Sequence, residues 1–141
     1  MYLATQLEEV YNLFLGEIED DEILLVSQET LENMLHGFLL KSIVDFKVCK
    51  KSLDIDYDTM SFKEDLTTEE QVILAKGMVW HYLNARIMRE ELMEVSITSK
   101  DFKSFANSGQ LKAMLELREV TKRDLKEYKF AYDYSEFKGF E

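Results

Sequence analysis

The feature that most constrains the fold is the stretch from Asp65 to Val95, which reads as one uninterrupted amphipathic helix. Proline and glycine punctuate chains, and this sequence has no proline and only five glycines. Thr67 and Glu70 have the spacing of a capping box, in which each side chain satisfies a backbone donor near the other residue. Apolar residues then follow at helical spacing, namely Val72, Ala75, Val79, Leu83 and Ile87, broadened by Ile73, Trp80 and Met88. At 1.5 Å per residue this helix is about 40 Å long, which suits the central strut of a bundle.

Three further stretches have helical periodicity. Residues 3–19 predict a first helix, and a second is expected to begin after Ser27, whose hydroxyl can cap it, and to end near Val44. Polar residues at 96–109 predict an elbow, and the last helix is expected over about 111–134. The inward residues expected in these three helices are Leu3, Leu7, Val10, Tyr11, Phe14 and Ile18, then Leu31, Met34, Leu35, Phe38, Leu39, Ile43 and Phe46, then Leu111, Met114, Leu115, Leu125, Tyr128 and Tyr132.

Residues of about 47–65 form the one non-helical excursion. Leu53, Ile55 and Tyr57 alternate with aspartates, which is the period of a half-exposed strand, and Phe62 is placed on a short return strand. The sequence therefore predicts a single domain over residues 1–141 with a mainly α fold. We expect a small bundle of four to five helices with a short β-hairpin or extended arm between helices two and three, and an aromatic tail at about 130–141.

Charge and cysteine content exclude several function classes. The 17 basic and 28 acidic residues give a net charge of −11, and an extended basic face for nucleic-acid phosphates is therefore not expected. The single cysteine, Cys49, cannot form an intramolecular disulfide or a thiolate metal cage. A signal peptide and a membrane-spanning segment are also not expected, which predicts a soluble protein with no membrane partner.

The sharpest candidate metal site is Asp54, Asp56 and Asp58 with Asp65. Calcium loops use oxygen ligands at positions one, three, five and twelve, and these residues have that spacing. Such loops also need glycine at position six and glutamate at position twelve, where this chain has Thr59 and Asp65. Alternating aspartates also discourage wrong pairing of exposed strand edges, and this acidic-edge interpretation is preferred.

The remaining chemistry-bearing residues nominate no reaction. His36 and His81 do not fit the spacing of zinc or diiron motifs, so a helix surface or packing seam is the expected place for both. Cys49 is expected to be an inert small apolar residue, and Trp80 is expected to be buried. The C-terminal aromatics could dock into a partner or fold back onto the core: Phe130, Tyr132, Tyr134, Phe137 and Phe140. No catalytic residue and no cofactor are predicted, and the chain is not expected to be an enzyme.

The order of blocks along the chain resembles one family over roughly residues 44–115. The blocks are Asp65-Leu66-Thr67, Ile73-Leu74-Ala75, Met78-Val79-Trp80, Lys100-Asp101-Phe102 and Ser104-Phe105-Ala106-Asn107. This order is similar to that of the neck proteins of tailed bacteriophages, the head–tail connector (adaptor) family that docks under the portal ring.

The resemblance implies a structural subunit without a catalytic centre. It implies a homo-oligomeric ring, dodecameric in the virion, which joins the portal protein to a stopper or tail-completion protein at the head–tail interface after synthesis in the host cytoplasm. By position it implies interface roles in the elbow for Lys100, Asp101, Phe102, Lys103, Phe105 and Asn107. Tyr57 and Phe62 in the arm and Tyr134, Phe137 and Phe140 in the tail are also expected at interfaces. An acidic lumen would let DNA pass without specific binding.

The net charge also permits a different class of function. A small acidic inhibitor, such as a DNA mimic that blocks a basic site, would bind its target as a monomer or dimer. Mimicry would need carboxylates spaced along one long surface, whereas here they are dispersed among lysines.

Overall fold

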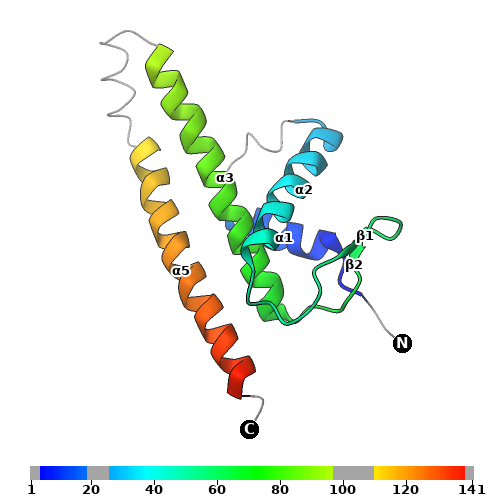
Figure 1. Ribbon diagram of the computed structural model, residues 1–141. Coiled ribbons are helices and arrows are strands. Elements are labelled where there is room, and N and C mark those ends of the chain that lie inside the picture. Colours follow the sequence, from blue (N-terminus) through cyan, green and yellow to red (C-terminus); the bar gives the residue numbers. More distant parts are fainter. Residues whose placement is uncertain (1–3, 19–25, 97–109, 139–141) are drawn as a thin grey trace.

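The computed structural model describes residues 4–18, 26–96 and 110–138. Over these ranges the chain forms four helices, α1 (Leu7–Glu17), α2 (Gln28–Asp45), α3 (Thr68–Ser96) and α5 (Gln110–Lys138). A two-stranded antiparallel hairpin, β1 (Ile55–Asp56) and β2 (Ser61–Phe62), lies between α2 and α3 (Figure 1). The predicted fold class, a small mainly α bundle with a short hairpin between helices two and three, is confirmed.

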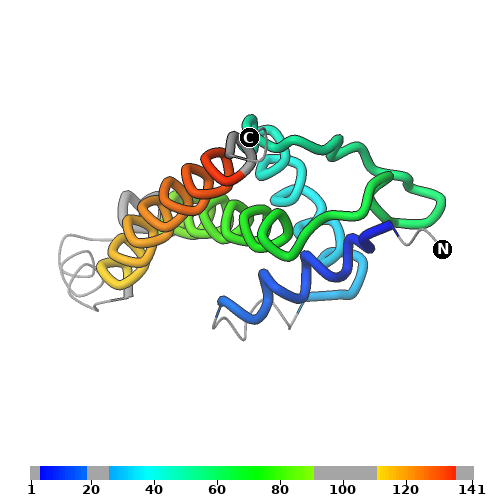
Figure 2. The backbone as a smooth tube through the Cα atoms, turned by 90° about the horizontal axis from the view of Figure 1, so that it is seen from below, coloured from blue at the N-terminus to red at the C-terminus, as the bar shows by residue number. Residues whose placement is uncertain are grey.

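Helix α3 is the central element. The other three helices each pack on it, α1 and α2 along its first half and α5 antiparallel beside it (Figures 1 and 2). Its predicted apolar face is confirmed at Ala75, Val79, Leu83 and Ile87, which are buried. Met88 is a correction, because it is 62% exposed and is not among the residues that pack against the core. The core is completed by residues from the other elements: Leu7, Val10, Phe14, Leu35, Leu39, Phe46, Phe62, Leu66, Leu125 and Tyr132.

The helix starts follow the predicted caps. The Thr67 backbone N–H donates to Glu70 Oε1 at 2.8 Å, and the Glu70 N–H donates to Thr67 Oγ1 at 3.1 Å, which confirms the capping box of α3. Ser27 caps α2 by accepting from the Thr30 N–H at 3.2 Å.

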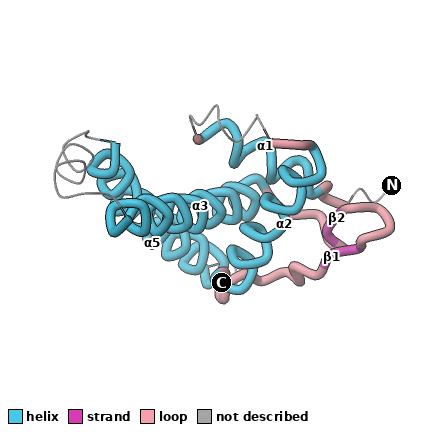
Figure 3. Tube along the Cα trace, turned by 90° about the horizontal axis from the view of Figure 1, so that it is seen from above, coloured by secondary structure: helices cyan, strands magenta, loops and turns pink. Residues whose placement is uncertain are grey.

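The predicted start of the first helix at residue 3 is wrong, because α1 begins at Leu7. The backbone before it is extended and pairs with the hairpin. Phe62 N–H donates to Thr5 O at 2.8 Å, Leu7 N–H donates to Met60 O at 3.1 Å, and Gln6 bridges Ser61. The segment of residues 5–7 therefore lies against β2 (Figure 3).

The hairpin is shorter than the alternation of residues 53–57 suggested, with two residues in each strand. Its turn includes Met60, which has a positive φ of 51° and is the one non-glycine residue with positive φ in the described ranges. Phe62 is fully buried, with no exposed surface. The prediction of Phe62 as an interface residue is therefore corrected, because the pairing with residues 5–7 turns its side chain into the core of its own chain.

Helix α5 packs on α3 through its predicted residues only in part. Leu125 and Tyr132 are buried, and Leu111, Met114 and Leu115 pack partly against the core. Tyr128 is 40% exposed and does not belong to the inward face. Trp80 is half-buried rather than buried, and the Arg118 guanidinium lies 5.9 Å from its ring centroid, a cation–π contact between α3 and α5.

Candidate functional site

The predicted interface residues have different outcomes in the structure. The elbow residues Lys100, Asp101, Phe102, Lys103, Phe105 and Asn107 lie outside the described residues, as do Phe140 and the side chain of Phe137. Tyr134 is 52% exposed and stacks on Phe130, with ring centroids 6.4 Å apart and ring planes within 10°. Phe130 is 73% exposed, so this aromatic pair forms an apolar patch on the outer face of α5.

The predicted calcium ligands are not brought together. Within the described ranges, no group of three or more His, Cys, Asp or Glu residues is placed to hold a metal ion. Asp56 Oδ1 instead accepts from the Asp58 N–H at 3.0 Å, a local turn bond. Asp65 Oδ1 accepts from the Thr5 hydroxyl at 3.1 Å. The carboxylates of Asp56 and Asp65 therefore serve turn and strand contacts, and the four aspartates do not form the predicted set of calcium ligands in this structure.

A buried polar cluster joins α3, the arm and α5 at Glu70, which is only 1% exposed. Tyr132 Oη donates to Glu70 Oε2 at 2.7 Å and accepts from the Lys50 N–H at 3.0 Å. The Lys51 ammonium lies 3.2 Å from Glu70 Oε1. Cys49 is half-buried with its sulfur 3.8 Å from Glu70 Oε2 and 3.9 Å from the Tyr132 oxygen.

The pKa shifts of this cluster have opposite directions. Burial acts to raise the pKa of Glu70, but the Thr67 N–H, the Tyr132 hydroxyl and Lys51 together hold it below the ordinary value. Burial, chiefly, raises the pKa values of Tyr132 and Cys49. The Tyr132 phenol and the Cys49 thiol are therefore protonated, and the Glu70 carboxylate beside them is ionised. Because each of these polar groups already has a hydrogen-bond partner, the cluster has a structural role in joining the three elements.

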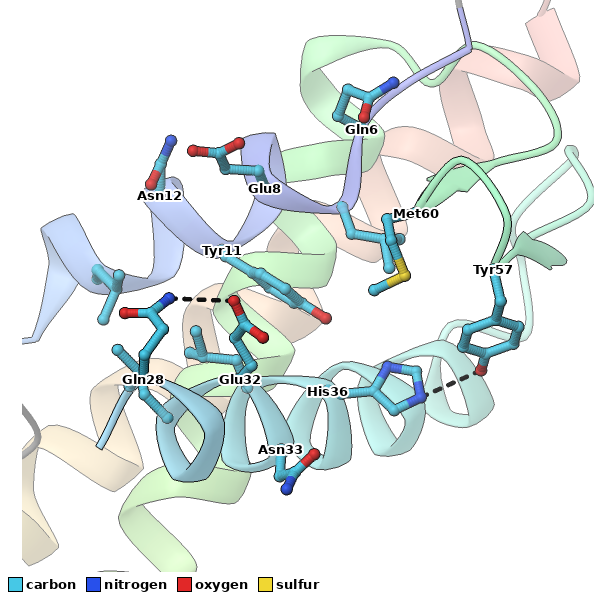
Figure 4. Close-up of a pocket in the computed structure, with 14 residues that line it drawn as sticks. Gln6, Glu8, Tyr11, Asn12, Gln28, Glu32, Asn33, His36, Tyr57 and Met60 are labelled. Atoms are coloured by element: carbon cyan, nitrogen blue, oxygen red, sulfur yellow. Dashed lines mark hydrogen bonds between the residues drawn. The ribbon is translucent and has the colours of Figure 1, made fainter. Parts of the chain in front are cut away.

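A groove lies between α1 and α2. It has a volume of about 600 Å³, and Tyr57 and Met60 of the hairpin turn close one end (Figure 4). Its floor is leucine-rich, with Leu7 and Leu35 buried and Leu15 and Leu31 half-buried. The rim is polar, and it includes two carboxylates, Glu8 and Glu32.

Two polar atoms in the wall of this groove have no hydrogen-bond partner in the structure. They are the Tyr11 hydroxyl and His36 Nδ1, and both are buried. In Figure 4 the Tyr11 ring reaches from α1 toward α2, with its hydroxyl on the side of His36. The other nitrogen of His36, Nε2, lies 3.1 Å from the Tyr57 hydroxyl, and the two rings meet edge to face at 5.4 Å. Burial, with smaller effects from Tyr57 and Glu32, raises the pKa of Tyr11 to about 12.

The sequence did not single out this groove. Tyr11 was expected only as an inward residue of the first helix, and His36 only at a helix surface or packing seam, which is where it lies. Tyr57 was expected at an interface and is 56% exposed. Nothing in the periodicity indicated that α1 and α2 diverge enough to leave a hollow between them.

The orphan hydroxyl gives a stability prediction. We expect Tyr11→Phe to raise the free energy of unfolding by about 1 kcal/mol, because it removes a buried polar atom without a partner and keeps the ring. Chemical denaturation at pH 7 measures this. The advantage should grow above pH 10, because the unfolded tyrosine then loses its proton while the folded one keeps it up to about pH 12.

Tyr57→Phe is the matched control, since it removes a hydroxyl that does have a partner, His36, on an exposed side chain. It should change stability by less than about 1 kcal/mol and in the unfavourable direction. A loss of stability in Tyr11→Phe larger than that in Tyr57→Phe would show that the Tyr11 hydroxyl is satisfied after all.

Comparisons with protein-family models, with curated proteins and with solved structures each find no match for this chain. None of the described helices has both the length and the apolar character needed to cross a membrane.

Proposed function

We propose that this chain is a structural subunit of the neck of a tailed bacteriophage. In this role it forms a ring, dodecameric in the virion, that joins the portal of the DNA-filled head to stopper or tail-completion proteins. The proposal rests on the order of sequence blocks from Asp65 to Asn107 that resembles the connector family. A small helical bundle is the architecture that this resemblance implies, and the described residues form such a bundle.

The outer surface supports an assembly role. The observation that carries most weight is the stacked Phe130–Tyr134 pair on α5, because an exposed apolar patch is typical of protein–protein contact sites. Val44, at the end of α2, is also 68% exposed. With a net charge of −11, a ring of such subunits would repel DNA passing through its lumen rather than bind it.

The alternative, an acidic inhibitor or DNA mimic, has less support. Several carboxylates lie in ion pairs across elements, such as Lys76 with Glu17 at 3.4 Å and Lys50 with Asp133 at 3.6 Å. These lysines interrupt the negative surface that imitation of a phosphate backbone requires. An inhibitor would also bind a basic enzyme and would not copurify with virions.

Electron microscopy of lysates from a phage that lacks this gene tests the proposal. We expect DNA-filled or leaking heads beside separate, complete tails. Complementation with Phe130→Ala/Tyr134→Ala should lower the stability of the subunit by less than about 1 kcal/mol, because both side chains are exposed and lose mainly their mutual stacking. It should reduce the yield of joined particles at least tenfold.

Leu117→Ala is the control for the complementation, since Leu117 is also an exposed apolar residue of α5, at 45%, in the half of the helix remote from the aromatic pair. Its yield should match that of the unaltered gene. Intact, infectious particles from the phage without the gene would contradict the connector function. The acidic-inhibitor hypothesis would then be preferred.

A further inference from the structure

The groove between α1 and α2 is built for an occupant with an apolar body. Its volume of about 600 Å³ is in the range of sites that enclose several side chains or a small ligand. Leu15 and Leu31 line it and remain partly exposed, although each also packs against the core. An aliphatic side chain placed between them would bury more apolar surface on both partners.

The rim of the groove is acidic and rich in hydrogen-bond acceptors. Glu8 and Glu32 line it, and none of its described lining residues is a lysine or arginine. An adjoining hollow of about 550 Å³ shares Gln6, Glu8 and Asn12 with the groove and adds two more carboxylates, those of Glu9 and Asp65. Lysines of neighbouring elements are engaged elsewhere, since Lys76 pairs with Glu17 and Lys51 pairs with Glu70. The groove therefore presents negative charge without an internal counter-charge among its lining residues.

The two orphan atoms add an independent indication. A buried polar atom without a partner costs stability, so its presence in a folded chain calls for an explanation. In the tautomer in which His36 Nε2–H donates to Tyr57, His36 Nδ1 is a hydrogen-bond acceptor beside the groove. The Tyr11 oxygen can also accept. Because both atoms are buried, the N–H donors of a ligand reach them when the Tyr11 and His36 side chains turn toward the groove.

We propose that this groove docks a basic, amphipathic segment of a partner protein, with an arginine at the acidic rim and a leucine-like side chain on the leucine floor. Arginine fits best because its guanidinium offers five donors in a planar fork while its stem covers apolar surface. Glu8 and Glu32 supply the counter-charges. This inference goes beyond the connector function and stands on the groove alone, so the failure of one leaves the other intact.

The test is a titration of the isotope-labelled full chain, followed by its amide NMR signals. The probe is the capped hexapeptide acetyl-Leu-Arg-Leu-Leu-Arg-Leu-amide, and its counterpart carries glutamate in place of both arginines. We expect saturable shifts of amides around Leu15, Leu31 and Glu32 with the arginine peptide and none with the glutamate peptide. The variant Glu8→Gln/Glu32→Gln should weaken binding by about three- to tenfold, the combined effect of two partly exposed ion pairs.

Glu119→Gln/Glu127→Gln is the matched control, because it removes two exposed carboxylates of α5, away from the groove, and changes net charge equally. It should leave the affinity unchanged. Three results would overturn the proposal: no saturable shifts at millimolar peptide, equal binding of the glutamate peptide, or equal weakening by the control variant. Shifts of the same amides on dilution without peptide would assign the groove to a second copy of this chain instead.

Discussion

Gly77→Ala is expected to lower the free energy of unfolding by about 2 kcal/mol, although alanine is the better helix former. At Gly77, helix α3 meets α2 with almost no space between them. A methyl group at this position would lie 2.1 Å from Ser42 Oγ and 3.0 Å from Ser42 Cβ. Ser42 is buried and donates to Leu74 O at 2.7 Å, so the clash also displaces that hydrogen bond. Thermal unfolding should show a fall of roughly 4–8 °C in Tm.

Two further variants isolate the cause. Gly37→Ala, in the middle of α2, meets nothing within 4 Å and should gain about 0.5–1 kcal/mol from helix propensity. Gly77→Ala/Ser42→Gly should recover most of the loss, because the nearest remaining atom is then Ser42 Cα at 3.5 Å, an ordinary contact. Equal stabilities for Gly77→Ala and the unaltered chain would mean that the two helices are not in such close contact.

Glu70→Gln is the second large effect, with an expected loss of about 2–3 kcal/mol at pH 7, the range for hydrogen bonds to a buried charged group. The carboxylate of Glu70 ties three parts of the chain, since it accepts from Thr67 at the start of α3, from Tyr132 of α5 and from Lys51 of the arm. An amide of the same shape can accept at one oxygen only, which leaves the phenol or the ammonium without its partner.

The loss should depend on pH in a defined direction. The pKa of Glu70 is lower in the folded chain than the ordinary value of 4.5, so the unfolded chain takes up a proton first as the pH falls. The contribution of Glu70 is fully present above about pH 5 and is lost as the pH falls through 4.5 toward the folded pKa. The difference in stability between the unaltered chain and Glu70→Gln should therefore stay constant from pH 7 to about pH 5 and shrink steadily below it, down to about pH 3.

Glu69→Gln is the matched control for both measurements. Glu69 is the neighbouring carboxylate in the first turn of α3 and is exposed, so it shares the interaction with the helix dipole but not the buried contacts. It should cost less than about 1 kcal/mol. Equal losses in the two variants would mean that the contacts to Tyr132 and Lys51 contribute nothing.

The sequence predicted the features that depend on local spacing. The capping box of Thr67 and Glu70, the cap at Ser27 and the inward spacing from Ala75 to Ile87 in α3 are patterns of three and four residues, and the structure confirms them. The partner of Glu70 in α5, Tyr132, is 62 residues away, and no pattern in the chain links the two. The contact of Glu70 with α5, in addition to its capping of α3, therefore could not be predicted from the sequence.

The errors at the arm have one physical cause. Thr5 and Gln6 fall within the predicted first helix, yet their backbone pairs with β2, and Phe62 beside them is buried. A long-range backbone pairing of this kind overrides local helix periodicity. The sequence also did not indicate the turn between β1 and β2, because Met60 has the positive φ usually adopted by glycine or asparagine.

The candidate groove is harder to predict, since it depends on how two helices diverge. Leu31 reads as an ordinary core position in its helical stripe, Leu15 is not part of the predicted stripe of the first helix, and only the packing leaves both lining a hollow. The aromatic pair on α5 was within reach of the sequence, since Phe130 and Tyr134 are four residues apart and therefore share a helix face.

Helices α3 and α5 have 29 residues each and run side by side beyond the ends of α1 and α2 (Figure 1). Glu70, near the start of α3, contacts the arm and α5, whereas the other end of α3 lies beside α5 and away from α1 and α2 (Figure 1). Met88 in the later part of α3 and Leu117 in the first half of α5 are both exposed. Amide hydrogens there should exchange with solvent by local opening, while those around Leu74 and Leu39 exchange only on global unfolding. We therefore expect local opening to be easier where the two long helices extend beyond α1 and α2 than in the core around Leu74 and Leu39.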